Sequence, residues 1–285
     1  MLFEKPNLKR PISLDLAGMV CIVVIITAYV TYGVCVIFGV VSGYDSGTQI
    51  TFLDLINGIA QIATALAFIL AYVQFRKNRI QQRQAIIAKE AESQLEKMIS
   101  VVSDMEVGEN SNLKNLNKSL TLLSNLATNF DELFKAMNED IQKGIVRMQW
   151  QDMYFNYLSH ALGDIDPVAI LKKEASIDEA ILEDAVSEAK RESEAENILS
   201  AFKDYVFTEK LFNHPNIKEA YSPIGKIDSL DMFVWHYLND HNLNDLLYGL
   251  LSRIDIRVRA PLLAVSGPSD WALEKRHESL NKRVN

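Results

Sequence analysis

Two long stretches of the chain carry no charged residue. Residues 16–44 and 55–75 contain no Asp, Glu, Lys or Arg, whereas charged residues are interspersed with apolar ones in the rest of the chain. As helices at 1.5 Å per residue, the stretches reach on the order of 40 Å and 30 Å, enough to cross a hydrocarbon core of about 30 Å. The pattern predicts transmembrane helices at 15–42 and 54–75, joined by an extracytoplasmic turn at 43–53.

Basic residues flank the two predicted spans unevenly. The connecting turn contains none. Three basic residues precede the first span and four follow the second; they are Lys5, Lys9 and Arg10, and then Arg76, Lys77, Arg79 and Arg83. Basic residues are retained on the cytoplasmic side of inner membranes. We therefore expect an inner-membrane protein with two spans, a cytoplasmic N-terminal segment at 1–14, and both termini in the cytoplasm.

The second predicted span carries two helical faces of distinct character. Polar residues spaced by three and four form a stripe, Asp54, Asn57, Gln61 and Thr64, and small residues form a candidate packing face, Ala60, Ala63, Ala67 and Ala71. Small residues at this spacing let membrane helices approach closely. The polar stripe favours hydrogen bonding within the hairpin or between copies. A water-accessible lining formed by several copies, or an interfacial stripe without consequence, are the alternatives.

After the second span the pattern changes to alternating steps of three and four. Residues 80–105 repeat it with two glutamines in the seam. The next repeat is apolar at every position: Leu113, Leu116, Leu120, Leu123, Ala127, Phe130, Phe134, Met137 and Ile141. This is the pattern of a coiled coil. With a turn composition at 108–112, it predicts a cytoplasmic antiparallel helical hairpin at 76–145, with parallel self-association through the same seam as the alternative.

The remaining residues, 146–285, predict a cytoplasmic helical domain. Aromatic residues concentrate within 145–162 and favour a buried helical core. Pro167 marks a break, and Ser176 with Glu179 resembles a capping box that opens a helix to about Val206. Further helices are expected at 229–241, 243–258 and 269–283, the last with Ser269 as its cap. The fold class is therefore all-α, a two-helix transmembrane hairpin followed by a coiled-coil-like cytoplasmic domain.

Charge and motifs narrow the possible functions. The net charge of −8 disfavours general nucleic-acid binding, although 253–283 is mildly basic and could contact nucleic acid, another subunit or anionic lipid. The sequence lacks phosphate-loop, nucleophile-elbow and zinc-binding motifs. Glu188 with Lys190, and the histidine–aspartate pairs His236 with Asp240 and His241 with Asp245, are better explained as helix surface. We expect no enzyme activity, no cofactor, no metal and no small-molecule substrate.

The layout resembles one class of bacterial protein. The two spans LAGMVCIVVIITAYVTYGVCVIFGVV and LINGIAQIATALAFILAYVQF, followed by the basic segment RKNRIQQRQ and a helical domain, resemble the two-transmembrane effectors of abortive-infection systems, including those of retrons. The resemblance implies an anti-phage effector that damages the inner membrane. It further implies a cytosolic protein or protein–nucleic acid regulator that keeps the soluble domain silent. Self-association is expected from the small-residue face and the coiled-coil seam. A membrane-anchored scaffold or signalling subunit without enzymatic activity is the alternative function.

Overall fold

The computed structural model describes residues 52–175, 177–196, 198–239 and 255–273, with single positions at 25, 29, 32, 33, 36, 243, 246 and 247. Every regular element in this part of the chain is helical, which confirms the all-α expectation. The chain divides into two compact units, Met1–Arg83 and Gln84–Asn285.

The first unit contains both predicted spans. The span at 15–42 lies outside the described residues apart from five single positions, and the segments 1–14 and 43–51 also lie outside them. Helix α2 runs from Phe52 to Ser103 and includes the predicted span at 54–75, although the side chains at 52–56, 59 and 62 are not described. Among the residues described, no helix has both the length and the apolar character needed to cross a membrane.

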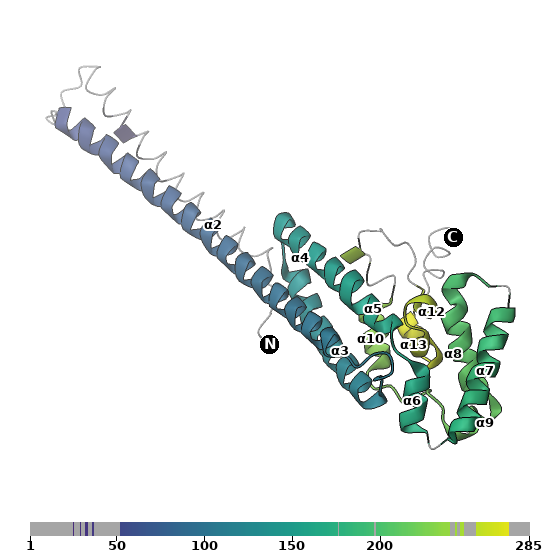
Figure 1. The fold of residues 1–285 in the computed structure, drawn as a ribbon. Helices are drawn as coiled ribbons and strands as arrows, with labels where there is room; N and C mark the ends of the chain where they lie inside the picture. Colours follow the sequence, from purple (N-terminus) through teal and green to yellow (C-terminus); the bar gives the residue numbers. More distant parts are fainter. Residues whose placement is uncertain are drawn as a thin grey trace. The chain divides into compact units, whose positions relative to one another are not determined.

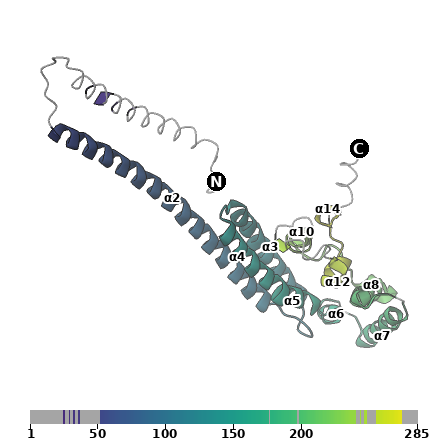
Figure 2. The same cartoon turned by 90° about the horizontal axis from the view of Figure 1, so that it is seen from above.

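The second unit begins with an antiparallel helical hairpin. Helix α3, Leu113–Ala136, follows α2 after a turn in which Gly108 adopts a φ of +60°. At one end Gln84 donates to the Ala136 carbonyl at 3.4 Å and accepts from the Asn138 amide at 2.8 Å. At the other end the Glu106 amide donates to Asn115 at 3.1 Å. These contacts confirm the antiparallel hairpin (Figures 1 and 2).

The apolar seam of the hairpin is buried over most of its predicted length. Seven of its members are buried and Leu113 is half-buried; the seven are Leu116, Leu120, Leu123, Ala127, Phe130, Phe134 and Met137. The last predicted member, Ile141, is 74% exposed and does not belong to the seam. The seam stops because α3 ends at Ala136 and the chain turns before the next helix begins at Asp140.

The aromatic segment forms the third layer against this hairpin. Helix α4, Asp140–Met153, continues through a π-helical turn, Tyr154–Leu158, into α5, Ser159–Gly163. The rings of Trp150 and Tyr154 are buried and stacked with centroids 5.1 Å apart, which confirms the expected helical core. The break at Pro167 is also confirmed, since α6, Pro167–Glu174, begins there with Asp166 as its cap.

The helix predicted to run from Ser176 to about Val206 is in fact two helices. Helix α7, Glu179–Ala195, is capped by Asp178, which accepts from the Ala180 amide at 2.9 Å; Ser176 lies outside the described residues. After a 3-10 turn, Ser200–Phe202, helix α8, Lys203–Asn213, packs against α7. The chain folds back because both helices have a buried apolar face, and each face covers the other. Helix α9, Pro215–Ala220, follows.

Four short helices complete the description. They are α10, Leu230–Tyr237; α12, Ile256–Arg259; α13, Pro261–Val265; and α14, Asp270–Leu273. Helix α10 packs against α3, α13 against α8, and α14 against α10. The helix predicted at 229–241 is shorter than expected, since α10 ends at Tyr237. The predictions at 243–258 and 269–283 fall largely on residues outside the description.

Candidate functional site

Helix α3 carries a second face beside its apolar seam. Asn117, Thr121, Ser124 and Thr128 follow one another by four, three and four residues. At about 100° per residue they form one row, rotated roughly 110° from the centre of the apolar seam. Four hydrogen-bonding groups on one face can hold a partner segment by polar contacts. In this structure that partner is the chain at 226–237, which Asn117, Thr121 and Thr128 contact, whereas the Ser124 hydroxyl donates to the Leu120 carbonyl at 2.8 Å.

Asn117 holds the loop that leads into α10. Its side-chain Nδ2 donates to the Lys226 carbonyl at 3.0 Å, and its Oδ1 accepts from the Asp228 amide at 3.0 Å. One side-chain amide therefore satisfies a backbone donor and a backbone acceptor, as a neighbouring strand would. The loop then turns at Ser229, whose φ of +56° lies in the left-handed region, and α10 begins.

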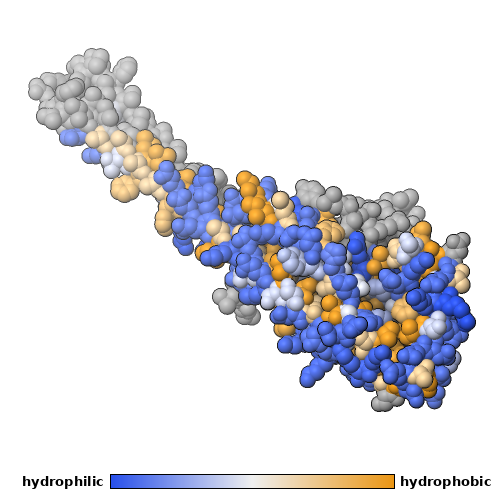
Figure 3. Space-filling model, in the orientation of Figure 1, coloured by the Kyte–Doolittle hydropathy of each residue, from blue (hydrophilic) through white to orange (hydrophobic). Residues whose placement is uncertain are grey.

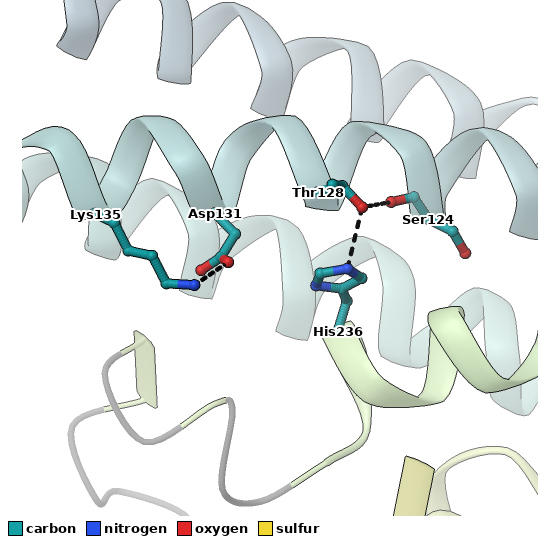
Figure 4. Close-up of polar contacts among 5 residues, drawn as sticks. All are labelled: Ser124, Thr128, Asp131, Lys135 and His236. Atoms are coloured by element: carbon teal, nitrogen blue, oxygen red, sulfur yellow. Dashed lines mark hydrogen bonds and ion pairs between the residues drawn. The ribbon is translucent and has the colours of Figure 1, made fainter. Parts of the chain in front are cut away.

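The far end of the row holds a histidine (Figure 4). The Thr128 hydroxyl donates its one hydrogen to the Ser124 carbonyl at 2.9 Å, and its Oγ1 lies 3.2 Å from Nε2 of His236. Since the threonine hydrogen is already used, Oγ1 accepts and Nε2 of His236 carries the donated proton. Burial lowers the pKa of His236. The nearby Asp131 carboxylate raises the pKa and the Lys135 ammonium lowers it, and these two side chains form an ion pair with each other.

Two further contacts lie between these ends. The Tyr237 hydroxyl, on a fully buried side chain, donates to the Leu123 carbonyl at 3.0 Å. Burial raises the pKa of Tyr237, so the hydroxyl keeps its proton at any physiological pH. The hydroxyls of Thr121 and Ser229 lie 3.2 Å apart. We call this set of contacts between α3 and residues 226–237 the α3–α10 seam.

The same segment holds the last described helix. The Asp231 carboxylate accepts from the amide of Ser269 at 2.7 Å and from its hydroxyl at 2.6 Å. Asn239 donates to the Ala272 carbonyl at 2.8 Å. Ser269 directly precedes α14, at the position expected of its cap, and its carbonyl accepts from the amides of Ala272 and Leu273. Helix α14 is therefore tied to α10, and through α10 to α3.

The sequence did not identify the α3–α10 seam. The signal for it is the four, three, four spacing of polar residues in 117–128, directly beside the stronger apolar repeat of α3. The partners are 108–114 residues further along the chain, so the spacing could show a polar face but not what it contacts.

The predicted membrane residues lie on α2. Asn57, Gln61 and Thr64 are exposed, as are the four alanines of the packing face, Ala60, Ala63, Ala67 and Ala71. The Thr64 hydroxyl donates to the Ala60 carbonyl at 2.8 Å, so its oxygen can still accept hydrogen bonds but it has no proton left to donate. The side chain of Asp54 is not described. The stripe and the alanine face are thus present as two neighbouring helical faces.

Groups that would support chemistry are scattered in the described residues. Glu188 lies 3.2 Å from Nε2 of His214 and 3.9 Å from Arg191, on the surface of α7. Asp240, His241 and Asp245 lie outside the description, so the two predicted pairs have no geometry here. In the part that is described, no group of His, Cys, Asp and Glu has the arrangement of a metal site.

One open groove accompanies the seam. It has a volume of about 510 Å³ and is lined by Leu113, Lys114, Asn117, Lys118, Thr121, Leu122, Glu174 and Asp228. Its two lysines and two carboxylates balance in charge, so the groove does not select an anion or a cation. No family model, curated protein or solved structure matches the chain.

Proposed function

We propose that this chain is a two-span inner-membrane effector of an anti-phage abortive-infection system. It perturbs membrane integrity when a partner releases its cytoplasmic domain. The observation that carries the proposal is the distribution of charge: two charge-free stretches, with basic residues outside both and none between them. The partner is a cytosolic protein or protein–nucleic acid complex, and copies of the chain associate in the bilayer.

The α3–α10 seam supports the regulated part of this proposal. Each hydrogen bond contributes only about 0.5–1.5 kcal/mol net, because water or a partner can satisfy the same groups after separation. Apolar burial also holds this segment, because Leu230, Phe233, Val234 and Tyr237 of α10 are buried in the core. A partner that displaces residues 226–237 must therefore offer α3 an apolar surface as well as equivalent donors and acceptors.

The polar stripe gives the membrane part a physical basis. In copies assembled around water, Asn57, Gln61 and Thr64 line the path, while Ala63 and Ala67 pack the helices together. Polar groups at this depth in a bilayer are costly unless they face protein or water. Small side chains at the packing face allow the close approach that such an assembly needs.

Induced expression with a membrane-potential dye tests the proposal. We expect rapid depolarisation that requires both charge-free stretches. Gln61→Leu should reduce ion leakage while protein amount stays constant, since the variant removes a polar lining group but keeps a similar volume. Ala67→Leu should instead disturb assembly, since its bulk separates the helices. If the natural trigger produces no depolarisation, or Gln61→Leu leaves conductance unchanged, the lining role is refuted.

A membrane-anchored scaffold or signalling subunit is the second candidate. It is favoured by apolar side chains exposed around α10 and α14, which include Met232 and Trp271. Tryptophan and methionine are enriched in protein–protein interfaces. A scaffold predicts harmless expression, no leakage in the wild-type protein, and no effect of Gln61→Leu. The same dye experiment therefore separates the two functions.

A further inference from the structure

Helix α4 has two apolar faces, and only one of them is buried. Val146, Trp150 and Met153 face the core and are at most 1% exposed. A second apolar row lies roughly 140° away around the helix and consists of Ile141, Ile145 and Met148. Ile141 is 74% exposed and Met148 69%, and Figure 3 shows apolar surface over the start of this helix. We call this second row the outer α4 stripe.

A groove on α2 adjoins the outer α4 stripe. From Gln84 onward α2 belongs to the second unit, where α4 runs alongside it in the same direction (Figures 1 and 2). Gln149, next to Met148 on α4, donates to the Glu92 carboxylate on α2 at 3.5 Å. Glu92 lines a groove of about 320 Å³ together with Ile86, Lys89, Glu90, Ser93 and Glu96. We call the groove and the stripe together the α2–α4 face.

The composition of the α2–α4 face indicates what kind of surface covers it. Three large apolar side chains exposed in a row are typical of a surface that is covered in the working protein. The groove beside them carries three carboxylates and one ammonium group, and no ion pair within the described residues engages Glu92 or Glu96. In a two-fold pair of copies the same carboxylates would face one another, which is unfavourable. The occupant should therefore combine apolar with basic side chains.

Residues 274–285 have this combination. They lie outside the described residues and directly follow α14. Their charged side chains are mostly basic, with Lys275, Arg276, Lys282 and Arg283 against Glu274 and Glu278. His277, Leu280 and Val284 continue from Leu273 by four, three and four residues, which is the spacing of one helical face. As a helix, the segment would present apolar and basic side chains together.

The other basic segment outside the description fits less well. Residues 1–14 are interrupted by Pro6 and Pro11, which disfavour a continuous helix, and they belong to the first unit. The acidic helix α7, which is described throughout, is a poorer target for the basic segment. Its carboxylates are accompanied by a single large apolar side chain that is exposed, Ile181.

Segment 274–285 is long enough to reach the α2–α4 face. Helix α14 packs against α10, and Gln151 of α4 donates to the Leu246 carbonyl at 2.9 Å, nine residues after α10 ends. Helix α4 therefore borders the part of the chain from which the segment starts. Passing to the other flank of α4 means crossing one helix, about 10–12 Å wide, whereas twelve extended residues span up to about 40 Å.

We infer that residues 274–285 dock on the α2–α4 face of the same chain, with their apolar side chains against the outer α4 stripe and their basic side chains toward Glu92 and Glu96. Because α14 is tied to α10, the docked segment also holds α10 in place, and its release loosens the α3–α10 seam. The inference concerns the second unit alone, so it does not depend on whether the first unit crosses a membrane.

Disulfide trapping in the purified full chain tests this inference. Cys21→Ala and Cys35→Ala remove the native thiols, and Met148→Cys with Leu280→Cys places one thiol on the stripe and one on the segment. The control pair is Leu199→Cys with Leu280→Cys, since Leu199 is also apolar and 74% exposed but directly precedes the 3-10 turn that leads to α8. After oxidation with copper phenanthroline, mass spectrometry identifies the linked peptides, and non-reducing gels separate single chains from linked dimers.

We expect the 148–280 disulfide to form several-fold faster than the 199–280 disulfide, and within single chains. Equal rates for the two pairs would overturn the inference. Disulfides at 148–280 that join two chains would also overturn it, in favour of a second copy as the source of the occupant.

Charge reversal provides an independent measurement on the same cysteine pair. Glu92→Lys with Glu96→Lys should slow the 148–280 disulfide several-fold, and adding Lys282→Glu with Arg283→Glu should restore its rate. The matched control, Glu183→Lys with Asp184→Lys on the exposed side of α7, changes the net charge equally and should have no effect. An unchanged rate after reversal on α2, or a loss that the compensating reversal does not restore, would refute the docking.

Discussion

Removing one hydroxyl from the α3–α10 seam should loosen α10 without disturbing the rest of the molecule. Tyr237→Phe keeps the buried ring, which lies 4.9 Å from the Phe233 ring between centroids, and deletes only the hydrogen bond to the Leu123 carbonyl. The carbonyl lies inside α3 and keeps its helical partner, so no buried acceptor is left unsatisfied. We therefore expect a loss of about 1 kcal/mol, in the middle of the range for a single neutral hydrogen bond.

Hydrogen–deuterium exchange on the full chain measures this loss where it occurs. A change of 1 kcal/mol corresponds to about a fivefold change in an opening equilibrium. Peptides that cover 230–237 should exchange about five times faster in Tyr237→Phe, while peptides from the hairpin core around Leu120 should not change.

Tyr205→Phe serves as the matched control. The Tyr205 hydroxyl donates to Glu209 four residues along the same helix, α8, so its removal should leave 230–237 unaffected. Unchanged exchange at 230–237 in Tyr237→Phe would refute the seam as an attachment. Acceleration throughout Gln84–Asn285 would show instead that the hydroxyl supports the whole fold rather than one removable segment.

Two further predictions concern His236 of α10 and the buried leucines of α3. Burial lowers the pKa of His236 in the folded protein, so below about pH 6.5 the unfolded state binds more protons than the folded state. The protection of 230–237 from exchange should therefore fall as the pH drops through that value. His236→Gln should abolish this pH dependence while it keeps a donor for Thr128. Replacing Leu120 and Leu123 with Asp, both fully buried, should cost several kcal/mol and expose Gln84–Asn285 to proteolysis, whereas Leu122→Asp, on the exposed side of α3, should leave it resistant. Protection that rises with acid would contradict the assignment of His236, and equal protease resistance in the double variant and in Leu122→Asp would contradict the assignment of the core.

The sequence predicts the hairpin well because its information is local. The steps of three and four in 113–137 identify a helix, its buried face and, with the turn at 108–112, its antiparallel partner. The same reasoning failed at Ile141, because a periodic pattern can continue by chance across a turn that the chain actually takes. Nothing in the local spacing marks 137–139 as the end of the helix.

Contacts between segments far apart in the chain could not be predicted from the local pattern of residues. Asn117 and Thr128 are ordinary surface residues of a coiled coil until a segment more than a hundred positions away is placed against them. The break after Ala195 was missed for a related reason. The composition of 179–206 is helical throughout, and only the packing of α8 against α7 explains why the chain turns.

The π-helical turn at Tyr154–Leu158 has a consequence for how this chain can change in length. A π turn contains one residue more than the corresponding α turn, so it takes up an insertion locally. Deleting a residue from an uninterrupted α-helix rotates everything beyond it by about 100° and would carry buried side chains to the surface. Deleting one residue from this turn converts it to α-helix and leaves Trp150 and Leu162 on the faces they already occupy. Natural variants that differ by one residue here should keep the fold, whereas the same change within 141–150 should destroy it.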